Sequence, residues 1–194
     1  MTQTNAPISG RFGTPVIALV LAAILAACSP GTSETTLAQR AGAPLFEGMG
    51  DFHREITTSD PDAQKYFDQG MVLAFGFNHA ESIRSFRAAQ TLDPSCAMCF
   101  WGEALATGPN INVTANGKTV MSADEQVAAY AALQKAVELA PSATPREQDV
   151  IAALEARYAP TPVEDRTALV VAPSRVALGI LVCENRTGGL HHRH

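Results

Sequence analysis

Cys96 and Cys99 are the two residues of this 194-residue chain whose type and spacing come closest to chemistry. They form a Cys-x-x-Cys at the expected start of a helix, where two thiols three positions apart can form a disulfide or bind a metal. The unpaired N–H groups at a helix start also favour the thiolate form of a cysteine. Three interpretations of the pair stay open: small buried thiols, a structural disulfide, or thiol redox and metal chemistry.

The residues around the two cysteines argue against a bound cofactor. Covalent haem attachment requires a histidine directly after the second cysteine, and Phe100 stands there instead. A zinc site would need two further ligands, but the sequence holds no second Cys-x-x-Cys and no His-x-x-x-His. His79 could join Cys96 and Cys99 as a ligand, although a histidine at a turn more often bonds a backbone carbonyl. We therefore expect no cofactor and no resident metal.

Other signatures of catalysis or of nucleic-acid binding do not occur in the sequence. It contains no nucleophile elbow, no glycine-rich phosphate loop and no pair of carboxylates set apart from solvated helix faces. The formal net charge is -5 and the few Lys and Arg residues are scattered, whereas a nucleic-acid binder needs a basic face. The sequence therefore predicts a protein that is not an enzyme and does not bind nucleic acid.

The elements that position these residues are predicted to be helices. Hydrophobic residues make up 46% of the chain and aromatic residues only 6%, which favours helices over a sandwich or barrel. Asp60-Pro61 is typical of a helix start, and Gly76 of its end. Asn78 is typical of the cap of a second helix, which Asp93-Pro94 closes. Two helices of about 15 residues joined by a two-residue turn must lie antiparallel.

The spacing within this hairpin resembles the tetratricopeptide repeat. The matching positions are Tyr66, Gly70, Leu73, Ser82, Phe86, Ala89 and Pro94, with serine at position 82 where alanine is usual. The pattern returns at Phe100, Ala104, Thr107, Ala129, Leu133, Ala136 and Pro141, after an inserted loop at 108–122, and a third unit begins at Thr144-Pro145. The resemblance implies an all-α fold over residues 59–158, an α-solenoid of antiparallel helix-turn-helix repeats with about two and a half repeats.

Three segments resemble, more narrowly, a group of bacterial envelope proteins with tetratricopeptide repeats, and that group has no activity to carry over. The segments are Tyr66-Phe67-Asp68-Gln69-Gly70, Gly76-Phe77-Asn78-His79 and Cys96-Ala97-Met98-Cys99-Phe100-Trp101-Gly102. Proteins of this group are usually much longer, and here the helical pattern fades after Tyr158 with no recognisable capping helix. We expect residues 159–194 to be an atypical tail. We also expect the chain to be a truncated or frameshifted form of a longer array, with residues after about Arg166 foreign to the family.

The N-terminus has the pattern of a secretory signal. Arg11 is the only charged residue before Glu34, and an apolar run of 12 residues follows it from Val16 to Ala27 (27 - 16 + 1). A membrane-spanning helix needs about 20 apolar residues, so this run is too short for one and is typical of a signal peptide.

The end of that run resembles the lipobox of bacterial lipoproteins. Its residues are Leu25-Ala26-Ala27-Cys28, and the resemblance implies cleavage before Cys28 and lipid attachment to its sulfur. An ordinary signal peptide with an incidental Cys28 is the alternative. We expect a signal peptide at 1–27 and a lipidated cysteine with a flexible tether and lead-in at 28–58. Because Ser29, and not aspartate, follows the cysteine, the resemblance favours the periplasmic face of the outer membrane.

The resemblance also implies a binding surface. If the positions of the family carry over, the first helix of each hairpin lines a concave groove with Gln64, Phe67, Met71, Phe75, Met98, Trp101 and Leu105. A lining of methionine and aromatic residues suits an amphipathic helix or an extended peptide. Alternatively, the lead-in from Phe46 to Ile56, or the inserted loop, already covers these side chains.

The expected function is a non-enzymatic scaffold or adaptor that binds a protein or peptide and is anchored to the bacterial envelope by lipid. The alternative is a thiol redox or metal-handling protein that uses Cys96 and Cys99. A lipoprotein that captures carbohydrate with Trp101 and the inserted loop would rest on fold analogy alone.

Overall fold

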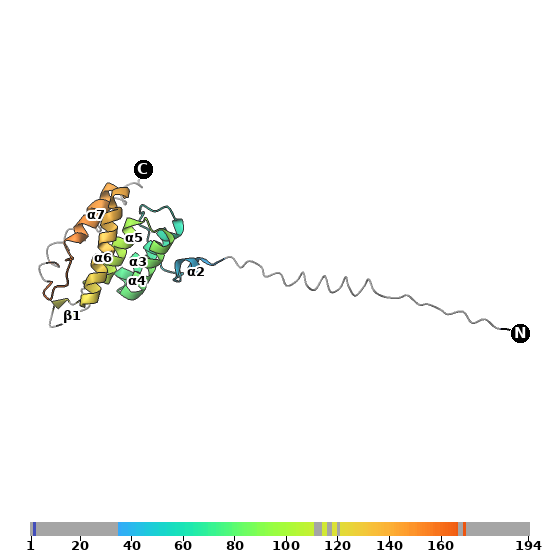
Figure 1. Cartoon of the computed structure of the whole chain (residues 1–194), viewed down its shortest axis with the longest axis horizontal. Helices are drawn as coiled ribbons and strands as arrows, with labels where there is room; N and C mark the ends of the chain where they lie inside the picture. Colours follow the sequence, from blue (N-terminus) through green and yellow to red (C-terminus); the bar gives the residue numbers. More distant parts are fainter. Residues whose placement is uncertain are drawn as a thin grey trace, which may run out of the picture. The chain divides into compact units, whose positions relative to one another are not determined.

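The described part of the chain is all-α. A computed structural model describes residues 35–110, 114–115, 118–119 and 121–166, together with the single residues 2 and 169. The chain divides into Met1–Thr35 and a compact unit Thr36–His194, and the elements below belong to the second unit. Its described residues form six α-helices, one 3-10 turn and two strands of two residues each (Figure 1).

The helices are α2 (Leu37–Ala41), α3 (Pro61–Phe75), α4 (His79–Leu92), α5 (Ala97–Thr107), α6 (Ala123–Leu139) and α7 (Pro145–Glu155), with the 3-10 turn Ala140–Ser142 after α6. Strands β1 (Thr114–Ala115) and β2 (Lys118–Thr119) pair antiparallel, with Thr114 opposite Thr119. Both strands lie in the stretch that the sequence predicts as an inserted loop.

Side-chain caps set the helix starts. The Asp60 carboxylate accepts a hydrogen bond from the N–H of Asp62 at 2.7 Å and begins α3. Asn78 caps α4 in the same way, and Ser122 and Thr144 form capping boxes at the starts of α6 and α7. The helix starts predicted at Asp60, Asn78 and Thr144 are confirmed, and Ser122 begins α6 at the end of the predicted inserted loop.

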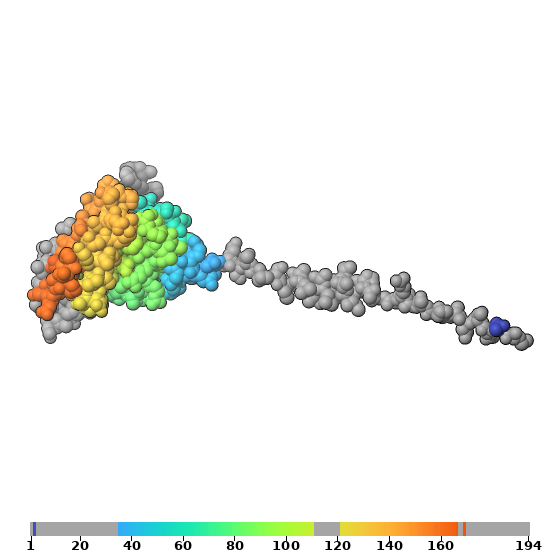
Figure 2. Space-filling model, in the orientation of Figure 1, coloured from blue at the N-terminus to red at the C-terminus, as the bar shows by residue number. Residues whose placement is uncertain are grey.

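Helices that follow one another along the chain pack against one another. α3 contacts α4, α4 contacts α5, α5 contacts α6, and α6 contacts α7. Figure 2 shows α6 in yellow and α7 in orange lying side by side on one face of this unit. The largest fully buried side chains come from all of these helices except α2: Trp101, Tyr66, Phe67, Phe86, Met71, Met98, Leu133, Ile151 and Leu154.

Two glycines let α3 and α5 approach the ring of Phe86 on α4. A Cβ atom placed on Gly70 would lie 2.7 Å from Phe86 Cε1, and one on Gly102 would lie 2.3 Å from the same atom. Both distances are far below van der Waals contact, so any larger residue at either position must displace the ring. The Phe86 ring is fully buried and also contacts Phe67 edge-on, with centroids 5.6 Å apart.

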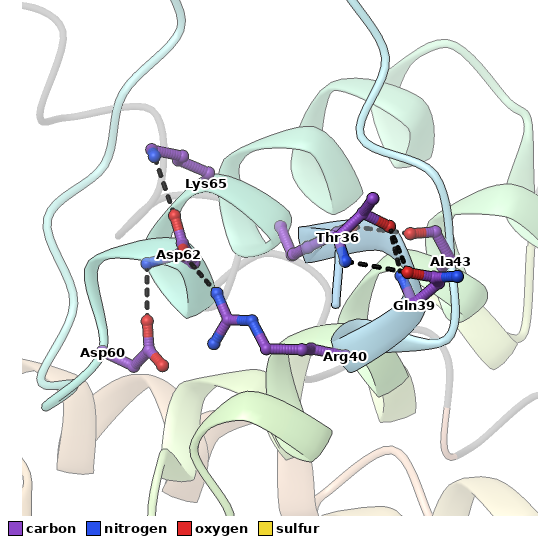
Figure 3. Close-up of polar contacts among 8 residues, drawn as sticks. Thr36, Gln39, Arg40, Ala43, Asp60, Asp62 and Lys65 are labelled. Atoms are coloured by element: carbon purple, nitrogen blue, oxygen red, sulfur yellow. Dashed lines mark hydrogen bonds and ion pairs between the residues drawn. The ribbon is translucent and has the colours of Figure 1, made fainter. Parts of the chain in front are cut away.

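The short helix α2 is fixed to the start of α3 by charged side chains. Thr36 and Gln39 form a capping box, and Arg40 donates to the Asp62 carboxylate at 3.0 Å (Figure 3). Lys65 contacts the other oxygen of Asp62 at 2.8 Å. Hydrogen bonds from these two bases lower the pKa of Asp62, with burial opposing them.

The segment 42–60 between α2 and α3, hereafter the lead-in, first runs along α3 toward the end of that helix. Tyr66 Oη donates to the carbonyl of Ala43 at 2.6 Å. One turn further along α3, the amide of Gln69 accepts from the N–H of Phe46 at 2.6 Å and donates to the carbonyl of Pro44 at 3.1 Å. Because Gln69 follows Tyr66 in α3 as Phe46 follows Ala43 in the lead-in, the two segments run in the same direction.

The lead-in then reverses and runs back. Gly48 and Gly50 have φ of 74° and 82°, the left-handed conformation in which glycine is unstrained. On the return, the N–H of Arg54 donates to Asp68 Oδ1 at 3.1 Å and the N–H of Ile56 to Gln64 Oε1 at 3.0 Å. The lead-in therefore forms a loop against α3, with its tip at residues 47–52.

Two carboxylates hold the end of the lead-in. Asp93, between α4 and α5, accepts hydrogen bonds from Thr58 Oγ1 at 2.6 Å and from the N–H of Ser59 at 2.8 Å. Glu147 of α7 accepts from the N–H and the hydroxyl of Thr57, at 2.7 and 2.6 Å. Burial by itself raises the pKa of both carboxyl groups, but hydrogen bonds outweigh it: those from Ser95, Thr58 and Ser59 lower the pKa of Asp93 strongly, and those from Thr57 and Thr144 lower the pKa of Glu147.

These lowered pKa values predict a loss of stability in acid. A carboxyl group with a lowered pKa in the folded state stabilises the fold above its unfolded pKa, about 4, and loses that contribution as the pH falls further. We expect the free energy of unfolding, measured by urea denaturation, to drop between about pH 5 and pH 3. Asp93→Asn should cost about 1–3 kcal/mol at neutral pH and flatten this drop, because it removes a charged acceptor. An unchanged pH dependence in the variant would contradict the assignment.

Residues that follow α7 pack back onto the helices. The Gln126 side chain of α6 bonds both the N–H and the carbonyl of Val163, at 2.9 and 3.1 Å, and accepts from Arg166 at 2.8 Å. Tyr158 Oη donates to the carbonyls of Ala104 and Gly108, and its burial raises the pKa of Tyr158 to about 12. The first part of the expected tail, 159–166, thus packs with the helices, and the rest, apart from Leu169, lies outside the described residues.

Candidate functional site

Cys96 and Cys99 form a disulfide, and both side chains are fully buried. Cys96 is the cap of α5, and its sulfur accepts the N–H of Cys99 at 3.2 Å. While the bond is intact, neither sulfur can act as a thiolate nucleophile or as a metal ligand. Of the three interpretations of the pair, the structure agrees with the structural disulfide.

His79 does not lie with the cysteines. It is the first residue of α4, whereas Cys96 follows the last residue of that helix, Leu92. A helix of this length separates its ends by about 20 Å, so the predicted group of His79, Cys96 and Cys99 does not assemble. Among the described residues, no group of three or more His, Cys, Asp or Glu side chains is placed to hold a metal ion.

The environment of His79 differs from the expected turn histidine. Both ring nitrogens are buried, and neither has a hydrogen-bond partner within the described part of the chain. Loss of hydration lowers the pKa of His79, which favours the neutral form of the ring. Its ring lies edge-on to that of Phe77, with centroids 6.4 Å apart. The expected bond to a backbone carbonyl is not formed.

The prediction of an open groove is wrong for most of its residues. Phe67, Met71, Met98 and Trp101 are at most 1% exposed. Helix α7 covers Trp101, whose indole N–H donates to the carbonyl of Val150 at 3.2 Å. These side chains form the core between the helices and are not open to a partner.

The lead-in occupies another part of the expected groove. The Gln64 side chain forms two hydrogen bonds with the lead-in backbone: it accepts from the N–H of Ile56 and donates to the carbonyl of Arg54 at 2.9 Å. Leu105 is partly buried against the core. Of all the predicted groove residues, only Phe75 has a large exposed fraction, 55%.

The exposed aromatic side chains lie instead at the end of α3 and in the lead-in. We use the name aromatic cluster for Phe46, Phe52, Phe75 and Phe77, which are 41%, 39%, 55% and 60% exposed. Phe52, at the lead-in tip, contacts Phe75 edge-on with centroids 6.2 Å apart. The backbone N–H of Phe46 bonds the side chain of Gln69, six residues before Phe75 in α3. Sequence analysis found only Phe75, because the lead-in has no periodicity that places its phenylalanines.

The backbone at Phe77 is strained. Helix α3 ends in a Schellman motif, in which the N–H of Phe77 donates to Ala74 and that of Asn78 to Leu73. Phe77 occupies the left-handed position of this motif, where glycine is usual, with φ of 61°. A bulky residue with such a φ is uncommon, and backbone strain of this kind concentrates at functional sites.

Replacing Phe77 by glycine is expected to stabilise the protein. The left-handed conformation costs a non-glycine residue roughly 1–2 kcal/mol, and the added freedom of glycine in the unfolded chain takes back part of that gain. We expect Phe77→Gly to raise the free energy of unfolding by about 0.5–1 kcal/mol, as measured by urea denaturation. Phe77→Ala is the control, because it removes the ring and keeps the strain. Equal stability of the two variants would contradict the strained conformation.

No protein-family model, no curated protein and no solved structure matches the chain. Within the described ranges, no helix combines the length and the apolar character needed to cross a bilayer. The fold is all-α, and its candidate site is the aromatic cluster at the end of α3.

Proposed function

We propose that this protein is a non-enzymatic binding module of the bacterial envelope, anchored by lipid at Cys28, whose partner binds at the aromatic cluster. The helices would form tetratricopeptide-like hairpins, α3 with α4 and α5 with α6, with α7 as the first helix of a third unit. This arrangement is supported by the contacts between successive helices and by the close approach of Gly70 and Gly102 to Phe86.

The envelope location is supported by two independent features. Leu25-Ala26-Ala27-Cys28 has the residues of a lipobox after a short apolar run. The Cys96–Cys99 disulfide is expected to persist in an oxidising compartment and to be reduced in the cytosol. Because Ser29, and not aspartate, follows Cys28, the proposed location is the periplasmic face of the outer membrane.

One observation carries the binding role: four phenylalanines with large exposed fractions lie at the end of α3 and in the lead-in that runs along it, with Phe52 against Phe75, while the predicted groove is filled. Exposed apolar patches on a folded domain commonly mark interaction sites, and aromatic residues dominate the binding energy of many interfaces. The strained Phe77 keeps its ring in solvent at a cost in stability, which fits a residue retained for contact.

A thiol redox or metal-handling role receives less support. Catalytic cysteines are partly exposed and have lowered pKa values, whereas both sulfurs here are fully buried in a disulfide. Thiol titration is expected to detect neither Cys96 nor Cys99 in the folded protein or in the protein unfolded by denaturant. Both should become detectable only when a reductant is added to the unfolded chain.

The anchor and the contact surface can be tested in the same cells. Radiolabelled palmitate should label the chain and fail to label Cys28→Ser. A photo-crosslinking amino acid at position 75 should yield a partner adduct, and Phe77→Gly should abolish it without loss of stability. The same crosslinker at Val127, which is 54% exposed on α6, is the control and should yield none. Adducts that form equally at both positions, or that survive Phe77→Gly, would disprove the proposed surface.

A further inference from the structure

We infer that the aromatic cluster receives a positively charged peptide segment of a partner protein, with Lys or Arg side chains against Glu47 and Asp51 and over the exposed rings. This inference rests on the proposed function and adds the chemistry of the partner. It follows from the charge of the lead-in tip and from the occupants that this charge disfavours.

The tip places two carboxylates between two rings of the cluster. Its sequence is Phe46-Glu47-Gly48-Met49-Gly50-Asp51-Phe52, and Glu47 and Asp51 are both exposed. Within the described part of the chain, neither carboxylate forms a hydrogen bond or an ion pair, and the backbone N–H groups of the nearby lead-in residues bond Gln69, Asp68 and Gln64. The nearest cations along the chain are Arg40, which is paired with Asp62, and Arg54, which is itself engaged in an interaction.

Other ionisable side chains near the cluster do not offset these two carboxylates. His53 is bonded to Asp68 at 2.8 Å, and Arg84 to Glu81 at 3.4 Å. From Gln69 to Asn78, the last part of α3 and the turn after it, the chain has no charged residue. The surface that surrounds the rings therefore carries an acidic excess at the tip.

The tip also leaves room for another chain to approach. A Cβ atom placed on Gly48 or Gly50 would meet no other atom within 4 Å, so their backbone faces open space. Lys and Arg bring three or more donors to a carboxylate and can lie over the face of a phenylalanine, which attracts a cation. One basic side chain can thus contact a carboxylate and a neighbouring ring of the tip at the same time.

Other occupants fit this surface less well. In a symmetric contact with a second copy of the chain, Glu47 and Asp51 would face carboxylates of the same tip, and like charges repel. An anionic lipid surface attracts basic segments and would repel the same two groups. A neutral apolar peptide would cover the rings, but it would remove water from the carboxylates without offering them a hydrogen-bond donor in its place. Charge complementarity therefore favours a basic segment.

The test uses two synthetic peptides of equal length, one alternating leucine with lysine and the other leucine with glutamate. Each is titrated by calorimetry into the full chain reconstituted in neutral phosphatidylcholine vesicles. We expect the lysine peptide to bind at least about tenfold more tightly than the glutamate peptide, with an affinity that falls as salt rises. Equal affinities, or an affinity independent of salt, would overturn the inference.

Variants separate the charge from the rings. Glu47→Gln with Asp51→Asn should weaken the lysine peptide about tenfold, whereas Asp124→Asn with Glu155→Gln, the same charge change on α6 and α7, should not. Phe77→Gly should weaken binding and keep the fold stable.

The outcomes distinguish the inference from the proposed function on which it rests. If Phe77→Gly lowers the affinity for both peptides equally and the lysine peptide binds no more tightly than the glutamate peptide, the charge inference fails and the proposed surface stands. If Phe77→Gly affects neither peptide, the proposed surface fails too. Cluster-dependent binding of phosphatidylglycerol vesicles in place of the lysine peptide would also overturn the inference.

Discussion

Trp101→Ala is expected to cost about 4 kcal/mol of unfolding free energy, which is a large share of the 5–15 kcal/mol that stabilises a typical domain. The indole is fully buried, so its removal leaves a cavity in the core where α5 meets α7. The substitution also removes the hydrogen bond from the indole N–H to the carbonyl of Val150. Urea denaturation followed by circular dichroism measures the loss directly.

Phe75→Ala is the matched control for Trp101→Ala. Both residues were expected in the same groove, but Phe75 is 55% exposed and Trp101 is not exposed at all. We expect Phe75→Ala to cost less than about 1 kcal/mol, because most surface substitutions have small effects. Similar, small losses in both variants would mean that Trp101 lines an open groove, contrary to the structure.

Gly102→Ala is expected to have the next largest effect, about 3 kcal/mol. The added methyl would lie 2.3 Å from the Phe86 ring, which is buried between α3 and α5 and has little space to move into. Gly76→Ala is the control, since its nearest contact is Val72 O at 3.3 Å and its φ is -78°. That change should alter stability by less than about 1 kcal/mol.

A smaller residue at position 86 should rescue Gly102→Ala. Phe86→Leu by itself removes buried surface and destabilises the protein, but it frees the space that the new methyl needs. The double variant should therefore be more stable than the sum of the two single effects predicts, by more than about 1 kcal/mol. Strict additivity of the two substitutions would show that Gly102 and Phe86 do not share the same space.

The helices could be predicted from the sequence because their signals are local. Asp60, Asn78, Ser122 and Thr144 each bond an N–H two or three residues further on, so a short stretch of sequence contains the whole interaction. The role of Gly102 was less visible, because its partner Phe86 lies on another helix. Only the repeat-like spacing of small and aromatic residues suggested that such close contacts would exist.

The candidate site could not be predicted because it depends on contacts between distant residues. The path of the lead-in is set by Gln64 and Gln69, whose side chains bond backbone groups 8 to 25 residues away, and amide residues carry no signal for such pairing. The exposure of Phe52 and the burial of Trp101 both follow from that path and from α7. The position of Phe77 in a left-handed turn was hidden because the preceding Gly76 is the residue that normally marks it.

The central claim is that the chain itself covers the residues predicted to line a groove, which leaves the aromatic cluster as the proposed surface for a partner. Trp101 is the only tryptophan of the chain, and its fluorescence reports on the burial of those residues without any substitution. The account predicts a blue-shifted emission for the native protein and strong protection from quenching by acrylamide, both lost on unfolding. A red-shifted emission that acrylamide quenches as readily in the native as in the unfolded protein would contradict it.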